Sequence, residues 1–175
     1  MLRREGGNVY AVLNDLDLAV NVDAQSPSSK HRTGTKPFMA IDLLSEESTV
    51  HLYRHDLESL FYVLVWITSR FKDGKEIPSP PLQEWAEGNH QNVAVSKGAF
   101  ISEPSLVPTE KFESYGPQIF RLHAMFRQGR FARSNARDHS RFNRGGAESS
   151  HFDDVTLGGF VTFDIFQNIL DTDLP

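Results

Sequence analysis

Acidic side chains directly follow a short apolar stretch near the start of the chain. Residues Val9 to Leu13 are apolar and partly β-branched, and Asn14 and Asp15 come directly after them. This pattern predicts a buried strand that ends in a polar turn. Because a strand end holds a side chain rigidly, Asp15 is a candidate for site chemistry. For an isolated aspartate after a strand, however, capping of the turn is the commoner role.

Arginines form a second candidate group, since they recur every three or four residues in the last third of the chain. On a helix they would make one basic stripe that could bind RNA, DNA or an acidic protein. Helix propensity is poor there, with residues such as Gly129, Ser134 and Asn135 inside the run. A solvated, flexible linker is therefore the preferred interpretation, and binding through the stripe is the alternative. The arginines are Arg127, Arg130, Arg133, Arg137, Arg141 and Arg144.

Two short strings resemble a catalytic motif in which an asparagine follows an aspartate base by five positions. In the string Arg54-His55-Asp56, position 61 is a phenylalanine, so the first string fails on chemistry. Asp138 and Asn143 have the correct spacing, but they lie in a stretch rich in Gly, Ser and Arg with no apolar strand to hold them. A general base must be held within hydrogen-bond reach of its target, so we interpret this match as chance.

The strongest predicted element is a helix from Asp56 to Ile67. Asp56 is a good N-cap, because its carboxylate can accept the free amide of Ser59. The rest of this helix is apolar on nearly every face, which predicts a position at the centre of a globule.

Further helices are predicted on both sides of proline-rich and polar breaks. Residues 82–100, around Trp85, are expected to form one or two short helices, and residues 115–126 form an amphipathic one. We expect residues 127–150 to be a flexible segment rich in Arg, Gly and Ser, and residues 151–175 to be an apolar tail that can dock on the preceding domain.

Composition limits the class of protein. A net charge of -5 argues against general binding to nucleic acid or to a membrane surface, since both need a positive field. The chain contains no cysteine, which excludes disulfides and cysteine-ligated zinc and fits a reducing compartment. The longest apolar run, Leu60 to Ile67, is too short to span a membrane. We therefore expect an intracellular protein, cytoplasmic or nuclear, with no membrane segment.

Three stretches, in this order, resemble the second half of a protein kinase domain of the fungal type. The first contains the strand and a metal-binding triplet, the second resembles the end of an activation segment, and the third resembles the central helix of the C-terminal lobe. They run from Val12 to Ala19, from Arg32 to Leu44 and from His51 to Ile67, and the last contains the string His55-Asp56-Leu57-Glu58-Ser59 of the helix start. The resemblance covers about Val9 to Phe126, and residues 85–100, Lys97 included, follow it in outline.

The resemblance implies roles for particular residues. Asp15 would be the Mg²⁺ ligand, because magnesium on nucleotide phosphates takes oxygen ligands in strict geometry. Thr33, Gly34 and Thr35 would belong to the activation segment, which shapes the platform for a protein substrate. Asp42 and Asp56 would be structural anchors. The activation loop would run from Asp15 to Thr33, and its hydroxyl groups are candidates for phosphorylation, although simple solvation is commoner for any one of them.

Residues absent from this sequence limit the activity that the resemblance implies. Phosphoryl transfer needs a glycine-rich loop, a strand lysine and a catalytic aspartate with its asparagine, all before the metal aspartate. Only 14 residues precede Asp15, and the chain contains no Gly-x-Gly-x-x-Gly. We therefore predict a mainly α-helical kinase C-terminal lobe over residues 1–126, with a short β element and no N-terminal lobe. Mg²⁺ and ATP are implied only through the family, the catalytic base is missing, and the protein partner or substrate is unknown.

Overall fold

The computed structural model describes residues 2–5, 8–11, 34–45, 50–103, 105, 107–142 and 152–172. The chain divides into two compact units, Met1–Arg32 and Thr33–Pro175. Most of the described secondary structure is helical, which confirms the predicted class. No described helix combines the length and the apolar character that crossing a membrane requires.

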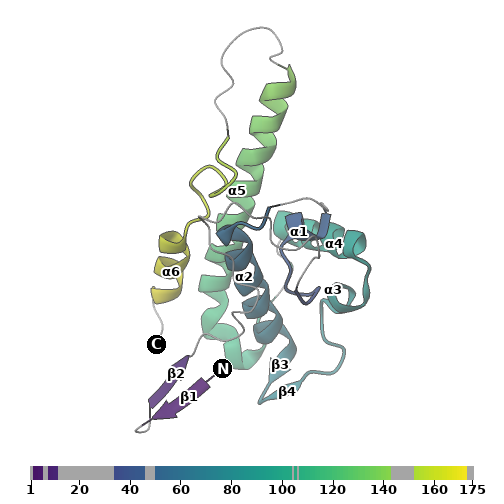
Figure 1. Ribbon diagram of the computed structural model, residues 1–175. Helices are drawn as coiled ribbons and strands as arrows, with labels where there is room; N and C mark the ends of the chain where they lie inside the picture. The colour runs from purple at the N-terminus through teal and green to yellow at the C-terminus, as the bar shows by residue number, and fades with distance from the viewer. Residues whose placement is uncertain are drawn as a thin grey trace. The chain divides into compact units, whose positions relative to one another are not determined.

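The first unit contains a β-hairpin. Strand β1 (Leu2–Glu5) pairs antiparallel with β2 (Asn8–Ala11), so that Leu2 lies opposite Ala11 and Glu5 lies opposite Asn8 (Figure 1). A strand was predicted from Val9 to Leu13, and β2 begins one residue earlier. Strand β1 was not predicted, because three of its four residues are charged and show no apolar alternation.

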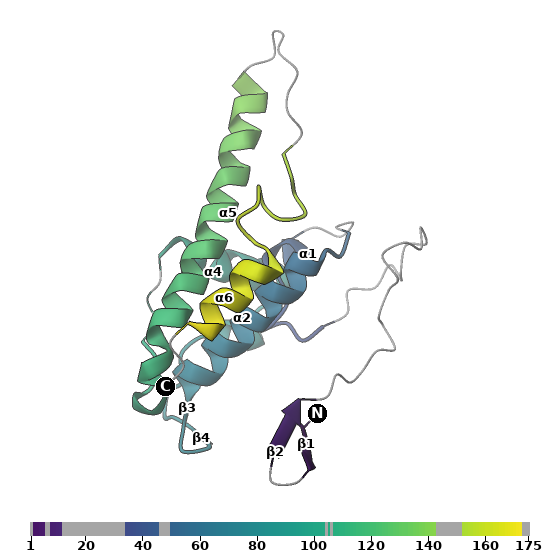
Figure 2. The same cartoon turned by 90° about the vertical axis from the view of Figure 1, so that its left-hand side faces the viewer.

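The second unit is organised around helix α2 (Tyr53–Arg70), which was predicted over a shorter range. Its residues Leu57, Phe61, Tyr62 and Val65 are buried in the core. The helix packs against α5 (Gly116–Phe142) and α6 (Phe163–Asp171), and Figure 2 shows all three running close together. The helix is thus central, as its apolar composition predicts, but it is not covered on every side, because Tyr53, Leu60 and Ile67 are exposed.

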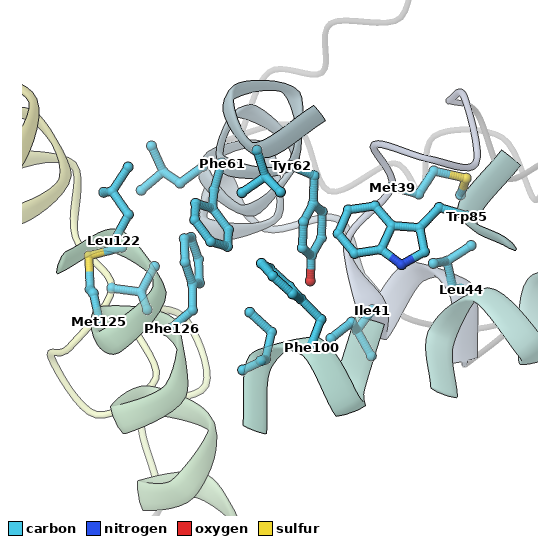
Figure 3. Close-up of a cluster of buried hydrophobic side chains, with 14 of the residues drawn as sticks. Met39, Ile41, Leu44, Phe61, Tyr62, Trp85, Phe100, Leu122, Met125 and Phe126 are labelled. Atoms are coloured by element: carbon cyan, nitrogen blue, oxygen red, sulfur yellow. The ribbon is translucent and has the colours of Figure 1, made fainter. Parts of the chain in front are cut away.

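Aromatic rings from four helices fill the centre of this unit (Figure 3). Phe61 of α2 stacks on Phe126 of α5 at 5.2 Å between ring centroids. Trp85, from α3 (Gln83–Glu87), meets the edges of Tyr62 at 5.1 Å and of Phe100 at 5.4 Å. Such edge-to-face and offset contacts add to the free energy gained by burying the rings.

Smaller elements complete the second unit. Helix α1 (Ile41–Ser45) packs against α4 (His90–Ser102), and α4 also packs against α3. The two short helices expected around Trp85 are therefore confirmed, and the Asn89 side chain caps α4 by accepting the amide of Asn92. Strands β3 (Phe71–Lys72) and β4 (Lys75–Glu76) form a hairpin whose two turn residues, Asp73 and Gly74, both have positive φ. A 3-10 helix, Glu110–Tyr115, leads into α5.

Helix α5 differs from its prediction, because it continues to Phe142 where we expected a flexible segment from residue 127. Elongating a helix that packing has already nucleated is easier than starting one, and the Ala and Arg residues of this stretch are good helix formers. From Ser134 onward every residue except Ala136 is exposed, and this end extends beyond the packed helices in both views (Figures 1 and 2). Residues 143–150 lie outside the described residues.

The C-terminal stretch packs onto α5 and α2. Thr162 caps α6 by accepting the amide of Ile165, and Phe166 is buried. Before this helix, Leu157 has a left-handed backbone with φ of 52° and is fully packed against α5. A Cβ on Gly129 of α5 would lie 2.8 Å from the Cβ of Leu157, so only glycine allows this close approach.

Candidate functional site at residues 34–42

The segment from Gly34 to Asp42 connects an exposed turn to a buried anchor. Gly34 has φ of 134°, and a turn follows in which the carbonyl of Thr35 accepts the amides of Phe38 and Met39. Gly34 and Thr35 are exposed, whereas Met39 to Asp42 are buried. Two predicted site residues, Asp15 and Thr33, lie outside the described residues.

Asp42 is held by three arginines from two helices. Arg133 of α5 makes a bidentate pair with it, Nη1 to Oδ2 at 2.6 Å and Nη2 to Oδ1 at 2.8 Å. Arg54 of α2 donates from Nη2 to Oδ2 at 2.8 Å, and Nη1 of Arg130 lies 3.4 Å from Oδ1. The fixed fork of a guanidinium matches a carboxylate well, so this cluster fixes the start of α1 to α2 and α5.

The electrostatics of the cluster keep Asp42 ionised. Burial by itself would raise the pKa of Asp42, but the hydrogen bond from Arg133, the proximity of His55 and the charges of Arg133 and Arg130 lower that pKa well below its usual range. The same pairing raises the pKa of Arg133. Asp42 is therefore ionised at neutral pH, and its interactions fit a structural anchor.

His55 and Asp154 lie at the edge of this cluster. The Nδ1 atom of His55 accepts the amide of Leu52 at 3.1 Å, so in the neutral ring the proton is on Nε2, which lies 3.7 Å from Asp42 Oδ2. Arg54 also donates from Nε to the carbonyl of Asp154, at 2.6 Å. These contacts connect the loop before α6 to the same cluster.

A second set of buried polar groups holds the backbone just before Asp42. Oε1 of Glu58 on α2 accepts the amide of Ile41 at 3.0 Å and the hydroxyl of Tyr62 at 2.8 Å. From α4, Nζ of Lys97 donates to the carbonyl of Met39 at 2.6 Å and lies 3.3 Å from that of Lys36. Residues 36–42 are thus bound to three helices through side chains that are almost completely buried.

Asp56 does not have the capping position that the sequence suggested. Helix α2 begins at Tyr53, so Leu52 is the N-cap and Asp56 lies within the first turns. Its carboxylate is 72% exposed and pairs with His51 at 2.8 Å, which raises the pKa of that histidine. The prediction failed because three residues before Asp56 also fit a helix, and His55 satisfies the Leu52 amide in place of a cap.

The arginine stripe is helical as far as Arg141, which contradicts the preferred interpretation of a flexible linker, and two of its arginines are used inside the fold. Arg133 is buried and Arg130 is partly buried, both beside Asp42, whereas Arg127, Arg137 and Arg141 are exposed. Asp138, the aspartate of the second imitation of a catalytic loop, lies on the exposed end of α5. Nothing described around it would hold a substrate.

Sequence reasoning did not identify Arg133, Glu58 or Lys97 as partners of this segment. These three residues differ from the other charged residues of the chain because they are buried, and burial depends on tertiary contacts. Among the described residues, no cluster of three or more His, Asp or Glu could hold a metal ion. His123 is buried, and its Nε2 lies 2.9 Å from the carbonyl of Phe100.

Comparison with known proteins agrees with the resemblance drawn from the sequence. A family model described as fungal protein kinase matches residues 1–68. This range contains Asp15, the whole segment from Gly34 to Asp42 and α2 as far as Thr68. No curated protein and no solved structure matches the chain.

Proposed function

We propose that this chain is a C-terminal-lobe portion of a fungal-type protein kinase, in which residues 34–42 form the platform for a protein substrate. The family activity is ATP-dependent phosphorylation of a Ser or Thr hydroxyl with Mg²⁺, and the 175-residue chain does not perform it alone. The observation that carries this proposal is the family match over residues 1–68, which spans all three stretches that resemble a kinase.

The geometry of residues 34–42 supports the platform role. A substrate platform must be rigid, because a reacting hydroxyl has to be held in a near-attack position. Asp42 is fixed by Arg54 and Arg133, while Met39 and Ile41 are fixed through their backbone groups by Lys97 and Glu58. The exposed Gly34 and Thr35 at the other end of the segment are free to contact a partner.

An exposed apolar line on α2 supports the idea that the chain is one portion of a larger lobe. Tyr53, Leu60 and Ile67 are spaced by seven residues, so they lie on one side of the helix. They are 41%, 44% and 42% exposed, although the other faces of α2 are in the core. A central helix normally packs on all sides, and the rest of a kinase lobe would cover this face.

The absence of phosphotransfer rests on residues that this sequence does not contain. It has no glycine-rich phosphate loop, and neither aspartate that imitates a catalytic base is placed to act as one. Asp15 would still supply a carboxylate for Mg²⁺, but a single carboxylate without the phosphate-binding lobe gives little affinity for nucleotide.

A titration of the full chain with ATP and Mg²⁺ tests this proposal. We expect no binding in the micromolar range by calorimetry, and no change on Asp15→Ala. Tight binding that Asp15→Ala abolishes, and that the exposed control Asp73→Ala leaves intact, would show that the chain binds nucleotide by itself.

The reading frame upstream of Met1 gives a second test. A catalytic loop and an ATP-binding lobe encoded in frame before residue 1 would make this chain part of a longer kinase, and phosphorylation of a protein substrate should then require them. A longer product with those motifs that lacks kinase activity would contradict the family assignment of function.

A further inference from the structure

Two oppositely charged side chains, from helices α4 and α2, contact the same short stretch of backbone. Lys97 on α4 is 0% exposed and Glu58 on α2 is 2% exposed. Lys97 donates to the carbonyl of Met39, and Glu58 accepts the amide of Ile41. The single residue between these two contacts, Ala40, is itself fully buried.

The charges match the backbone dipoles at this point. The turn at residues 35–39 ends with the carbonyls of Lys36 and Met39, which lie 3.3 and 2.6 Å from the Nζ atom of Lys97. Helix α1 starts directly afterwards, and its first amide faces the carboxylate of Glu58. A cation at carbonyl ends and an anion at an amide start are both favourable, and here neither is screened by solvent.

Tyr62 connects the two charged groups. Its hydroxyl donates to Oε1 of Glu58 at 2.8 Å, and the Nζ of Lys97 lies 3.9 Å from the centre of its ring. Trp85 provides a second aromatic face, 5.2 Å from the same Nζ. Lys97 therefore has two carbonyls and two ring faces as partners and makes no ion pair with a carboxylate among the described residues.

The geometry points to Lys97, Tyr62 and Glu58 acting as a proton-sensitive clasp on the backbone of residues 39–41, which sets how firmly the segment from Gly34 to Asp42 is held. Lys97 is a positioning residue in this arrangement. That the held segment is a substrate platform rests on the proposed function, whereas the clasp itself rests only on these contacts.

The surroundings of Lys97 determine whether opening of the segment becomes easier or harder as the pH rises. Burial lowers the pKa of Lys97 to about 7, and the Glu58 carboxylate acts in the opposite direction. When the segment opens, Lys97 becomes hydrated and its pKa returns toward 10.5. At any pH between about 7 and 10.5, opening of the segment therefore takes up a proton on Lys97. Opening therefore becomes harder as the pH rises above 7, and below 7 its dependence on this group disappears.

Other titratable groups near the clasp are few. On α2 they are Glu58 and Tyr62, whose pKa is raised well above its usual value by burial and by Glu58. Lys36, in the turn, donates from Nζ to the carbonyl of Gly88, and Glu84 of α3 accepts the hydroxyl of Ser96. Asp42 on α1 stays charged throughout this range.

Hydrogen exchange of the full chain, measured on peptides that cover residues 34–44, tests the clasp. Lys97→Met keeps the apolar stem and removes the ammonium, which leaves the buried carbonyl of Met39 without a donor. We expect exchange of residues 38–41, corrected for intrinsic rates, to rise about tenfold or more. The thermal midpoint at pH 6 should fall only slightly, because the lost hydrogen bonds are partly offset by the removal of a buried charge. The matched control is Lys111→Met, an exposed lysine with an ion pair at 3.5 Å, which should change neither quantity.

The pH dependence in the wild type provides a readout that does not depend on any variant folding. Protection of residues 38–41 should increase with pH, by up to about tenfold per unit above pH 7, and Lys97→Met should show no such increase. Equal protection at pH 6 and pH 9 in the wild type would overturn the proposal. So would an increase in exchange in Lys97→Met that is uniform over α5, since that would report global unfolding. Neither result depends on nucleotide binding, so failure of the clasp and failure of the kinase assignment are distinguishable.

Discussion

Helix α5 contains arginines at steps of three or four residues in its first half, taken up to Arg133, and in its second half, from Ser134, but the two halves lie in different environments. In the first half, Arg133 is buried in a bidentate pair with Asp42, and Gly129 receives the side chain of Leu157. In the second half, Arg137 and Arg141 are exposed and make no hydrogen bond or ion pair with any described residue. The arginines recur every three residues from Arg127 to Arg133 and every four from Arg133 to Arg141, and Arg127 is exposed as well. Spacing alone therefore does not distinguish a structural arginine from a solvated one.

This difference shows where charge contributes to the fold. A guanidinium desolvated beside a carboxylate has a strong interaction but depends on its partner, whereas an exposed guanidinium is solvated by water and contributes little. The first half of α5 therefore belongs to the candidate site through Asp42. The second half is a solvated helical extension.

The largest expected effect on stability comes from changing Asp42, the partner of the buried arginines. Asp42→Ala leaves Arg54, Arg130 and Arg133 without their carboxylate, and we expect a loss of about 3–5 kcal/mol in the free energy of unfolding. Arg133→Met should have an effect of the same order, whereas Arg137→Met should change stability by less than about 0.5 kcal/mol. Urea denaturation followed by circular dichroism measures all three.

The loss of stability at acid pH gives a second test of the role of Asp42. The pKa of Asp42 is held far below the ordinary 3.8, so its contribution to stability is fully present above about pH 5, begins to fall as the pH drops below the ordinary value, and is lost completely only toward the lowered pKa. Asp42→Asn should therefore show a weaker loss of stability between pH 5 and pH 3 than the wild type. Parallel curves for the two proteins would mean that the cluster does not stabilise the fold.

Gly129 tests whether the first half of α5 is closely packed against Leu157 while the second half is exposed to solvent. Gly129→Ala would gain up to about 1 kcal/mol in helix propensity on an isolated helix. In this fold we expect a net loss of about 1–3 kcal/mol, because the new Cβ would overlap with Leu157. The control is Ser134→Ala on the exposed half, which should be neutral or slightly stabilising. If Gly129→Ala also proves stabilising in thermal melts, Leu157 does not pack as the structure shows.

The smallest effect concerns binding through the exposed half. Because Arg130 and Arg133 interact with Asp42, only Arg127, Arg137 and Arg141 of the described arginines in the stripe remain exposed, on a chain with a net charge of -5. We expect no binding to a nonspecific oligonucleotide at low salt by fluorescence anisotropy. If binding is observed, falls with salt, and is removed by the double change Arg137→Ala and Arg141→Ala, the alternative of a nucleic-acid-binding helix is supported.

Periodicity predicted the elements whose apolar pattern is strong. The central helix, the short helices around Trp85 and the start of α5 were all identified in this way. Weakly patterned elements were missed or shortened, as in the charged strand β1, the two-residue strands β3 and β4, and α5 beyond residue 127. Packing of the preceding turns sustains such a helix, and propensity does not report that packing.

For the candidate site, the sequence by itself determined which segment to consider. The string from Thr33 to Asp42 and the family resemblance that it carries are local in the chain, and the family match over residues 1–68 agrees with them. Only the tertiary structure decided what holds this segment, because Glu58, Lys97 and Arg133 are 17 to 91 residues away from the groups that they contact. A buried charge is stable only where partners from distant elements replace water, and a linear sequence does not record that arrangement.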